Sequence, residues 1–206
     1  MNAQGKRSGE TAREYAYRMI REQVISLELK PGEAFNDMEF AAKIGVSRTP
    51  VREAVIQLSE ESRIIEIFPQ RGMRIAPIDV ELVEEARSLR VLLEKQIAGM
   101  CCEMATEEDI KWLQENVGLQ EFYMENSRPE MVMQLDDEMH HKLFMICHRE
   151  LTYGMCQKLA IHYDRIRSLS VNTVKDNTII EDHRKIIQFI AEHKKENAMA
   201  QMEKHL

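Results

Sequence analysis

The chain has 206 residues, with 28 Lys and Arg against 35 Asp and Glu, a formal net charge of −7 and 44% hydrophobic residues. This length accommodates one large or two small hydrophobic cores, and the composition is that of an ordinary globular protein. No apolar run approaches the roughly 18 residues of a membrane span, and residues 1–9 lack a signal-like apolar region, so we expect a cytoplasmic protein without a membrane partner.

Two consecutive short helices are predicted in the first third of the chain. Asn36 is a favourable N-cap, and Gly45 can supply the left-handed residue that ends the first of them. Ser47 or Thr49 can cap the second helix, which we expect to run from about residue 48 to residue 61. Two helices joined by so tight a turn are typical of a helix-turn-helix.

The second of these helices has two different faces. Arg48 and Arg52 are one turn apart at its N-terminal end, where guanidinium groups can bind phosphates or the edge of guanine. Taken alone, the arginine pair could equally be solvated and form surface ion pairs with Glu53 or Glu60. The face that would pack on the first helix carries an apolar stripe of Val51, Ala54, Val55 and Leu58.

A β-hairpin is predicted directly after the second helix. Two short β-type runs, at residues 64–68 and 73–76, flank the turn residues Pro69 to Gly72. The hairpin completes a winged helix-turn-helix, with Arg71 at a tip that could enter a minor groove. The alternative role for Arg71 is that of an ordinary exposed turn residue.

Residues from about 15 to 77 resemble the DNA-binding domain of the GntR family of bacterial transcription regulators. The resemblance rests on Pro31-Gly32-Glu33 and on the Gly-Val-Ser-Arg-Thr-Pro-Val-Arg-Glu-Ala segment at residues 45–54. The family usually has glycine where this chain has Ser62, which predicts strain in the turn into the wing. The resemblance implies that the residues that contact operator DNA are Ser47, Arg48, Thr49, Arg52, Arg71 and Gly72.

The acidity of the chain lies outside this DNA-binding segment. Residues 1–76 hold 12 Lys and Arg and 11 Asp and Glu, whereas the remaining residues hold 16 and 24. A nearly neutral DNA-binding domain depends on a few well-placed arginines. A homodimer on a palindromic operator would double the phosphate contacts.

The rest of the chain has helical periodicity and no strand pattern. Pro77 can end the wing and Asp79 can cap a helix, so we expect a winged domain at residues 1–76 and an all-α domain at residues 77–206. The predicted fold class is therefore mainly α, a winged helix-turn-helix followed by a six-helix bundle. The six helices are expected at residues 79–104, 107–126, 129–147, 151–172, 177–193 and 196–206.

One carboxylate and three imidazoles could converge inside this bundle. Asp136 and His140 are four residues apart and share a helix face. His183 and His205 lie at equal distances from the turn near residue 194, so an antiparallel hairpin would bring them level. This ligand set suits a borderline divalent ion, zinc foremost, with nickel or manganese as further candidates.

The spacing leaves other interpretations open. The histidines could be unrelated core or surface residues. A competing pair, Asp137 and His141, points about 100° away around the same helix. The remaining histidines, His148, His162 and His193, have no matched partner.

The four cysteines give no sign of a disulfide framework. They show no C-x-x-C spacing and lie in apolar stretches, so we expect buried, reduced thiols, as in a reducing compartment. The four are Cys101, Cys102, Cys147 and Cys156.

Residues 79–206 resemble the all-α effector domain of FadR-type GntR regulators, called the FCD domain. The resemblance rests on the segment from Arg90 to Glu94, on Asp-x-x-Met-His at residues 136–140 and on the spacing of the last two histidines. It implies that Arg90 lines a cavity where small organic acids bind. It also implies a metal site formed by Asp136, His140, His183 and His205.

These features predict a homodimeric transcription regulator that binds palindromic double-stranded operator DNA and acts as a repressor. A small organic acid, a divalent metal or both would control the binding by shifting the bundle between two packings. The alternative is a DNA-binding protein with a purely structural metal site and no metabolite sensing. A metalloenzyme is not expected, because the chain lacks H-E-x-x-H and any setting for a nucleophile.

Overall fold

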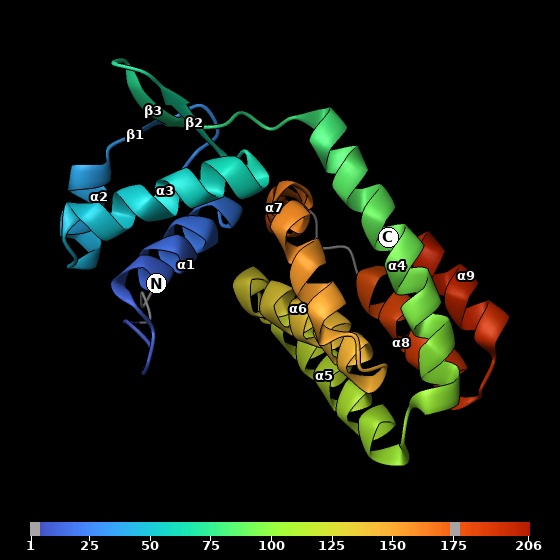
Figure 1. Cartoon of the computed structure of the whole chain (residues 1–206). Coiled ribbons are helices and arrows are strands. Elements are labelled where there is room, and N and C mark those ends of the chain that lie inside the picture. Colours follow the sequence, from blue (N-terminus) through green and yellow to red (C-terminus); the bar gives the residue numbers. More distant parts are fainter. Residues whose placement is uncertain (1–4, 174–177) are drawn as a thin grey trace. The chain divides into compact units, whose positions relative to one another are not determined.

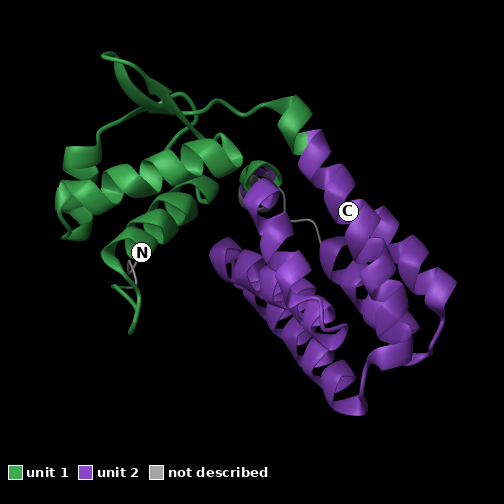
Figure 2. Cartoon of the chain, viewed as in Figure 1, with its two compact units in different colours: residues 1–83, 161–165 green, residues 84–160, 166–206 purple. Residues whose placement is uncertain are grey.

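The computed structural model describes residues 5–173 and 178–206. The chain divides into two compact units (Figure 2), the first made of Met1–Val83 with Ile161–Arg165 and the second of Glu84–Ala160 with Ile166–Leu206. By this division the expected boundary between residues 76 and 77 lies a few residues inside the first unit, and a short piece of a later helix belongs to that unit as well.

The first unit is a winged helix-turn-helix. Its elements are α1 (Ala12–Ile25), β1 (Ala34–Phe35), α2 (Asp37–Ile44), α3 (Arg48–Ser62), β2 (Ile65–Phe68) and β3 (Gly72–Ile75). Helices α1 and α3 lie side by side (Figure 1), and the strands form an antiparallel sheet in the order β1-β3-β2. The register pairs Ala34 with Arg74 and Ile65 with Ile75. The two helices and the hairpin of the wing were predicted, whereas α1 and β1 were not.

Capping chemistry fixes both ends of α2. The Asn36 side chain accepts hydrogen bonds from the backbone N–H groups of Met38 and Glu39, and Gly45 ends the helix with φ +73°, as predicted. The expected side-chain cap of α3 is wrong. Ser47 occupies the N-cap position without a capping hydrogen bond, and Thr49 lies inside the helix.

The core of the first unit lies between α1 and α3. The predicted stripe of α3 is fully buried, and it faces Ala16, Ile20 and Val24 of α1, which are also fully buried. The turn into the wing shows how the chain accommodates Ser62. Its buried hydroxyl donates to the Leu58 carbonyl at 2.9 Å, and Arg63 takes the left-handed conformation with φ +55°.

The second unit is built from helices. They are α4 (Val80–Met104), whose first turn belongs to the first unit, α5 (Glu107–Glu125), α6 (Pro129–Ile146), α7 (Glu150–Thr173), α8 (Thr178–Ala191) and α9 (Lys195–His205). These bounds lie within two residues of the predictions, and the expected start of one helix at residue 177 falls outside the described residues. The predicted fold class is confirmed.

The interior of the second unit is formed by apolar side chains from five helices. Fully buried members include Ala98 of α4, Leu113 of α5, Met139 of α6, Ile186 of α8 and Met202 of α9. Met139, between Asp136 and His140 on α6, is thus a core residue. Among the described helices, none is both long enough and apolar enough to cross a membrane.

The left-handed turn between α2 and α3 can be tested with one substitution. A Cβ at Gly45 meets no atom, but the φ of +73° strains any L side chain, so Gly45→Ala is expected to lower the free energy of unfolding by about 1 kcal/mol. The matched control is Gly118→Ala on the exposed face of α5, where the same change should stabilise the protein by about 0.5–1 kcal/mol. Urea denaturation followed by circular dichroism measures both, and equal effects would contradict this account of the turn.

Candidate functional site

The start of α3 presents an exposed pair of guanidinium groups. The side chains of Arg48 and Arg52 are 57% and 59% exposed. Both arginines pair with the carboxylate of Asp37, a buried residue at the start of α2. Arg48 Nε donates to Asp37 Oδ1 at 3.0 Å, and Arg52 Nη1 lies 3.6 Å from Asp37 Oδ2. A shared buried carboxylate limits the rotamers of two long side chains, so both arginines are already oriented before any ligand arrives.

Asp37 is a functional candidate that the sequence did not suggest. The residues considered as ion-pair partners were Glu53 and Glu60, which lie on α3 itself. The partner comes instead from the preceding helix. Acidic residues are common at the first position of a helix because they stabilise the helix dipole. Asp37 therefore does not stand out in the sequence as a partner of the two arginines.

All the residues expected to contact DNA are accessible. Ser47 and Thr49 are exposed beside Arg48 at the start of α3. Arg71 and Gly72 are exposed at the tip of the wing, where Gly72 has φ +99° and the Arg71 backbone N–H donates to the Phe68 carbonyl at 3.0 Å. The recognition helix and the wing therefore both offer polar groups that a duplex could reach.

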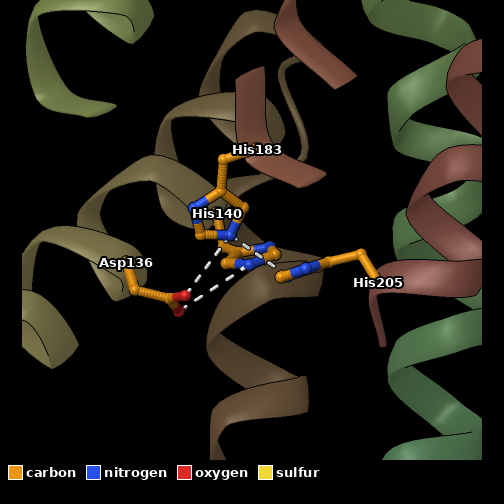
Figure 3. A group of neighbouring side chains, drawn as sticks. All are labelled: Asp136, His140, His183 and His205. Atoms are coloured by element: carbon orange, nitrogen blue, oxygen red, sulfur yellow. Dashed lines mark hydrogen bonds and ion pairs between the residues drawn. The ribbon is translucent and has the colours of Figure 1, made fainter. Parts of the chain in front are cut away.

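A second candidate site lies within the helical unit. Asp136 and His140 project from α6, His183 from α8 and His205 from α9, and they converge as Figure 3 shows. One ligand atom from each residue falls within 4.8 Å of all the others. His183 Nε2 lies 3.1 Å from His205 Nε2 and 3.4 Å from Asp136 Oδ1, and His140 Nε2 lies 3.7 Å from Asp136 Oδ2.

This geometry fits a tetrahedral divalent ion. Zinc–nitrogen bonds of about 2.0–2.1 Å at tetrahedral angles separate two ligand nitrogens by roughly 3.3 Å, close to the spacings found here. His140 Nε2 is buried and has no hydrogen-bond partner, which is costly for a polar atom unless it binds something. Nitrogen and carboxylate donors without sulfur are compatible with zinc, nickel or manganese.

Polar side chains behind the histidines orient the rings. The side chain of Gln120, fully buried on α5, lies with Oε1 2.9 Å from His183 Nδ1, and its Nε2 donates to Asn116 Oδ1 at 2.7 Å. An acceptor at Nδ1 places the ring proton there and turns the lone pair of Nε2 toward the cluster. Gln120 was not predicted as a functional residue, since an interior glutamine on a helix has no distinctive spacing.

Glu94 performs a related role from α4. Its Oε2 is in close contact with His140 Nδ1, and its Oε1 accepts a hydrogen bond from Arg90 Nε at 2.6 Å. Burial by itself would raise the pKa of Glu94, but Arg90 and then His140 outweigh it, and the net pKa is far below its usual range. Arg90 is thus a buried residue that forms an ion pair with Glu94 and is connected to the cluster through that residue.

Arg167 of α7 is a further cation at the cluster. Its Nη2 makes a short ion pair with Asp136 Oδ2, and its Nη1 donates to Asp137 Oδ1 at 3.0 Å. Burial raises the pKa of Asp136, but the Arg167 guanidinium reverses this, and the net pKa lies well below its usual range. Asp136 is therefore a carboxylate, the form that binds a metal.

The two histidines opposite Asp136 are held neutral. Burial, followed by His140, lowers the pKa of His205 to about 4, and burial, followed by His205, lowers that of His183 well below its usual 6.5. Neutral imidazoles are the form that ligates metals.

The other histidines do not join the cluster. His141 stacks on Tyr153 with ring centroids 4.4 Å apart, and its partner Asp137 is half-exposed beside Arg167. His193 Nδ1 lies 2.6 Å from the Cys102 carbonyl, and His162 belongs to the first unit, against the Ser62 carbonyl. The competing pair is thus separated from the converging residues, in agreement with the preference for Asp136 and His140.

Comparison with known proteins identifies relatives of both halves of the chain. Residues 12–75 match the model described as bacterial regulatory proteins, gntR family, and residues 85–206 match the FCD domain. The HTH-type transcriptional repressor RspR of Escherichia coli (strain K12) is 30% identical over 158 residues, covering 77% of this chain and 69% of RspR. The Nta operon transcriptional regulator of Aminobacter aminovorans is 27% identical, covering 88% of this chain and 85% of that protein.

A solved structure supports the fold. E. coli McbR/YncC superimposes with a TM-score of 0.78 at 18% identity, covering 95% of this chain and 93% of McbR. The matched families and relatives are transcription regulators and not enzymes. This confirms the prediction from the sequence that the chain is a transcription regulator and not a metalloenzyme.

The neutral histidines predict a pH dependence of stability. The folded pKa of His205, about 4, lies below the unfolded value of 6.5, so the unfolded state binds more protons between these values and stability falls as the pH falls. For chelator-treated protein we expect a loss on the order of 3 kcal/mol in the free energy of unfolding between pH 6.5 and pH 4. The free energy of unfolding should depend less on pH in His205→Gln than in the wild type, whereas the exposed control His148→Asn should keep the wild-type dependence. If the His205→Gln variant showed the same pH dependence of stability as the wild type, His205 would not be neutral in the folded protein.

Proposed function

We propose that this chain, which belongs to the GntR family of bacterial transcription regulators and carries an FCD domain, is a repressor whose operator binding is controlled through the cluster at Asp136. The controlling ligands are a divalent metal, most suitably zinc, and a small organic acid. The observation that carries the proposal is the convergence of one carboxylate and three imidazoles from α6, α8 and α9 on a single point.

Two features support a metal rather than a self-contained polar network. His140 Nε2 is buried among the converging residues without a hydrogen-bond partner, and a metal ion would provide one. Gln120 and Glu94 lie behind two of the rings, as outer groups do in metal sites. A bound divalent ion would supply a strong positive charge, and an anionic effector could bind it as a fifth ligand if the coordination shell expands.

Arg90 supports the organic-acid part of the proposal. It is a buried guanidinium one residue away from a candidate metal ligand, through Glu94. A carboxylate that bound Arg90 would compete with Glu94 and so act on His140. An effector that bound in this way would stabilise one packing of the helices relative to another. Control of DNA binding requires such a difference in stability.

Two further elements of the proposal concern assembly and DNA. Palindromic operators are read by two recognition helices, and the second unit exposes apolar side chains suited to burial in a homodimer, among them Leu92 at 68%, Leu151 at 82% and Met155 at 66%. In each protomer Arg48 and Arg52 would contact phosphates or bases in the major groove, with Ser47 and Thr49 beside them. Arg71 and Gly72 would reach the minor groove.

The alternative is a metal that only stabilises the helical unit. The ring of buried polar groups around the cluster would serve a structural ion as well as a sensing one. The two differ in whether the affinity for operator DNA responds to an organic acid once metal is bound.

Loss of a ligand should weaken metal binding without unfolding the chain. We expect wild-type protein to bind one equivalent of Zn²⁺, and His205→Gln to bind it roughly 100-fold or more weakly, because one of four ligands is removed. Isothermal titration calorimetry after chelation measures both, with His148→Asn as the exposed control. Failure of the wild-type protein to bind any of Zn²⁺, Ni²⁺ or Mn²⁺ would remove the basis of the proposal.

The recognition helix should determine affinity for DNA. For a duplex selected in vitro by the protein, Arg52→Ala is expected to weaken binding at least about tenfold, because a guanidinium contact to a base is worth roughly 1–3 kcal/mol. The control is Arg13→Ala, at an exposed position of α1 outside the recognition helix. Fluorescence anisotropy reports both, and equal affinities for the two variants would exclude Arg52 from the interface.

A further inference from the structure

Helices α4 and α6 meet along a seam that is polar at one end and carries sulfur at the other. Glu94 contacts His140 at the first end, and Cys101 contacts Cys147, the residue that caps α6, at the second. Both contacts join residues 46 apart, and both pairs advance by seven residues. The helices therefore run parallel in a constant register over about two turns.

The two thiols at the second end are close and specifically placed. Cys101 Sγ lies 3.5 Å from Cys147 Sγ, and the two residues are 0% and 1% exposed. Each sulfur also lies near a backbone carbonyl of the other helix, 3.4 Å from Leu143 O for Cys101 and 3.6 Å from Ile97 O for Cys147. A disulfide needs the sulfurs at about 2.0 Å, so its formation requires both side chains to rotate and the two helices to approach each other.

The remaining cysteines do not compete for this pairing. Cys102 Sγ is directed elsewhere, toward the Ala98 carbonyl at 3.5 Å and the Phe189 carbonyl of α8 at 3.9 Å. Cys156 lies on another helix, α7. Among the described residues, Cys101 and Cys147 are the two cysteines whose sulfurs are in contact with each other.

We propose that Cys101 and Cys147 are a redox-active dithiol that a small hydroperoxide converts into a disulfide joining α4 to α6. This modification site is independent of the proposed metal, because neither sulfur belongs to the cluster of Asp136, His140, His183 and His205.

The chemistry balances with hydroperoxide as the oxidant. In the proposed step Cys147 is the thiolate and Cys101, whose sulfur lies 3.5 Å away, is the second thiol; a hydrogen bond from Cys101 lowers the pKa of Cys147, opposed by burial and aided by Arg149. Its sulfur attacks one peroxide oxygen, the O–O bond breaks, and a sulfenic acid and hydroxide result. The Cys101 thiol then attacks the sulfenic sulfur and displaces a second hydroxide. The two thiol protons convert both hydroxides to water, so two thiols and one H₂O₂ give one disulfide and two H₂O.

Oxidation would fix the seam that positions Glu94. A covalent bond two turns away holds α4 in the register that places Glu94 against His140. It would thus resist any shift of α4 along α6. This consequence rests on the proposed function, whereas formation of the disulfide does not.

The test is mass spectrometry of the full-length protein. Reduced, folded protein is treated with graded H₂O₂, unreacted thiols are alkylated in denaturant, and tryptic peptides are mapped without reduction. We expect a cross-link between the peptide of Cys101–Cys102 and that of Cys147, and a melting temperature raised by several degrees over the reduced form. Because Cys101 and Cys102 share a peptide, Cys101→Ser should abolish the cross-link and the matched control Cys102→Ser should retain it.

Three results would overturn the proposal. One is that both thiols stay fully alkylatable at peroxide concentrations that oxidise free cysteine within the same time. Another is a cross-link that survives in Cys101→Ser or that involves Cys156. The third is over-oxidation of Cys147 to sulfinic acid without a cross-link. Peroxide treatment of the denatured chain provides the reference, since it should distribute the pairing among all four cysteines.

Discussion

The helical unit depends on a concentration of ionisable groups where a protein core normally excludes them. Asp136, His140 and His183 are almost fully buried, and Arg90 and Glu94 lie beside them. A charge taken out of water is costly unless it is paired, so this arrangement persists only because every carboxylate has a cationic partner. Asp136 has Arg167 and Glu94 has Arg90. The helices that supply these groups are therefore held in relation to one another by electrostatics as well as by apolar packing.

The same constraint makes the cluster responsive. In the proposed function, a cation would satisfy His140 Nε2, which is buried without a hydrogen-bond partner, and an anion could pair with Arg90, which is buried, or with Arg167, whose side chain is 15% exposed. Arg90 and Arg167 approach from α4 and α7, so anions that engaged them would act on two different helices. The proposed control would therefore convert a change of charge in the FCD domain into a change of helix packing.

The first unit solves an electrostatic problem of its own. With nearly equal numbers of basic and acidic residues, it has no general attraction for DNA and depends on where its cations point. The buried carboxylate of Asp37 positions Arg48 and Arg52 at the start of α3. In the proposed DNA complex, the two arginines would bind without the entropy loss of ordering two free side chains.

The sequence was sufficient for the parts of the molecule that follow local rules. Asn36 and Gly45 define α2 through capping, and the stripe on α3 defines its buried face, so the winged helix-turn-helix and the helical unit were both predicted. The four converging residues followed from helical spacing and a hairpin. What spacing cannot reveal is a partner brought close by tertiary packing. Asp37, Gln120 and Arg167 each act on a residue from another helix, and no periodic pattern marks them. Helix α1 was not predicted, although Thr11 and Glu14 form a capping box at its start.

The central claim is that an organic acid acts through the cluster to change operator binding. It is tested most directly by the operator Kd of Zn²⁺-loaded protein, measured by fluorescence anisotropy across a panel of small mono- and dicarboxylic acids whose own binding is followed by calorimetry. The account predicts that at least one acid that binds changes the operator Kd about tenfold or more, within the range of typical coupling energies, and that Arg90→Leu removes this response. An operator Kd that stays constant while acids bind at the cluster, or a panel in which no acid binds, would contradict it.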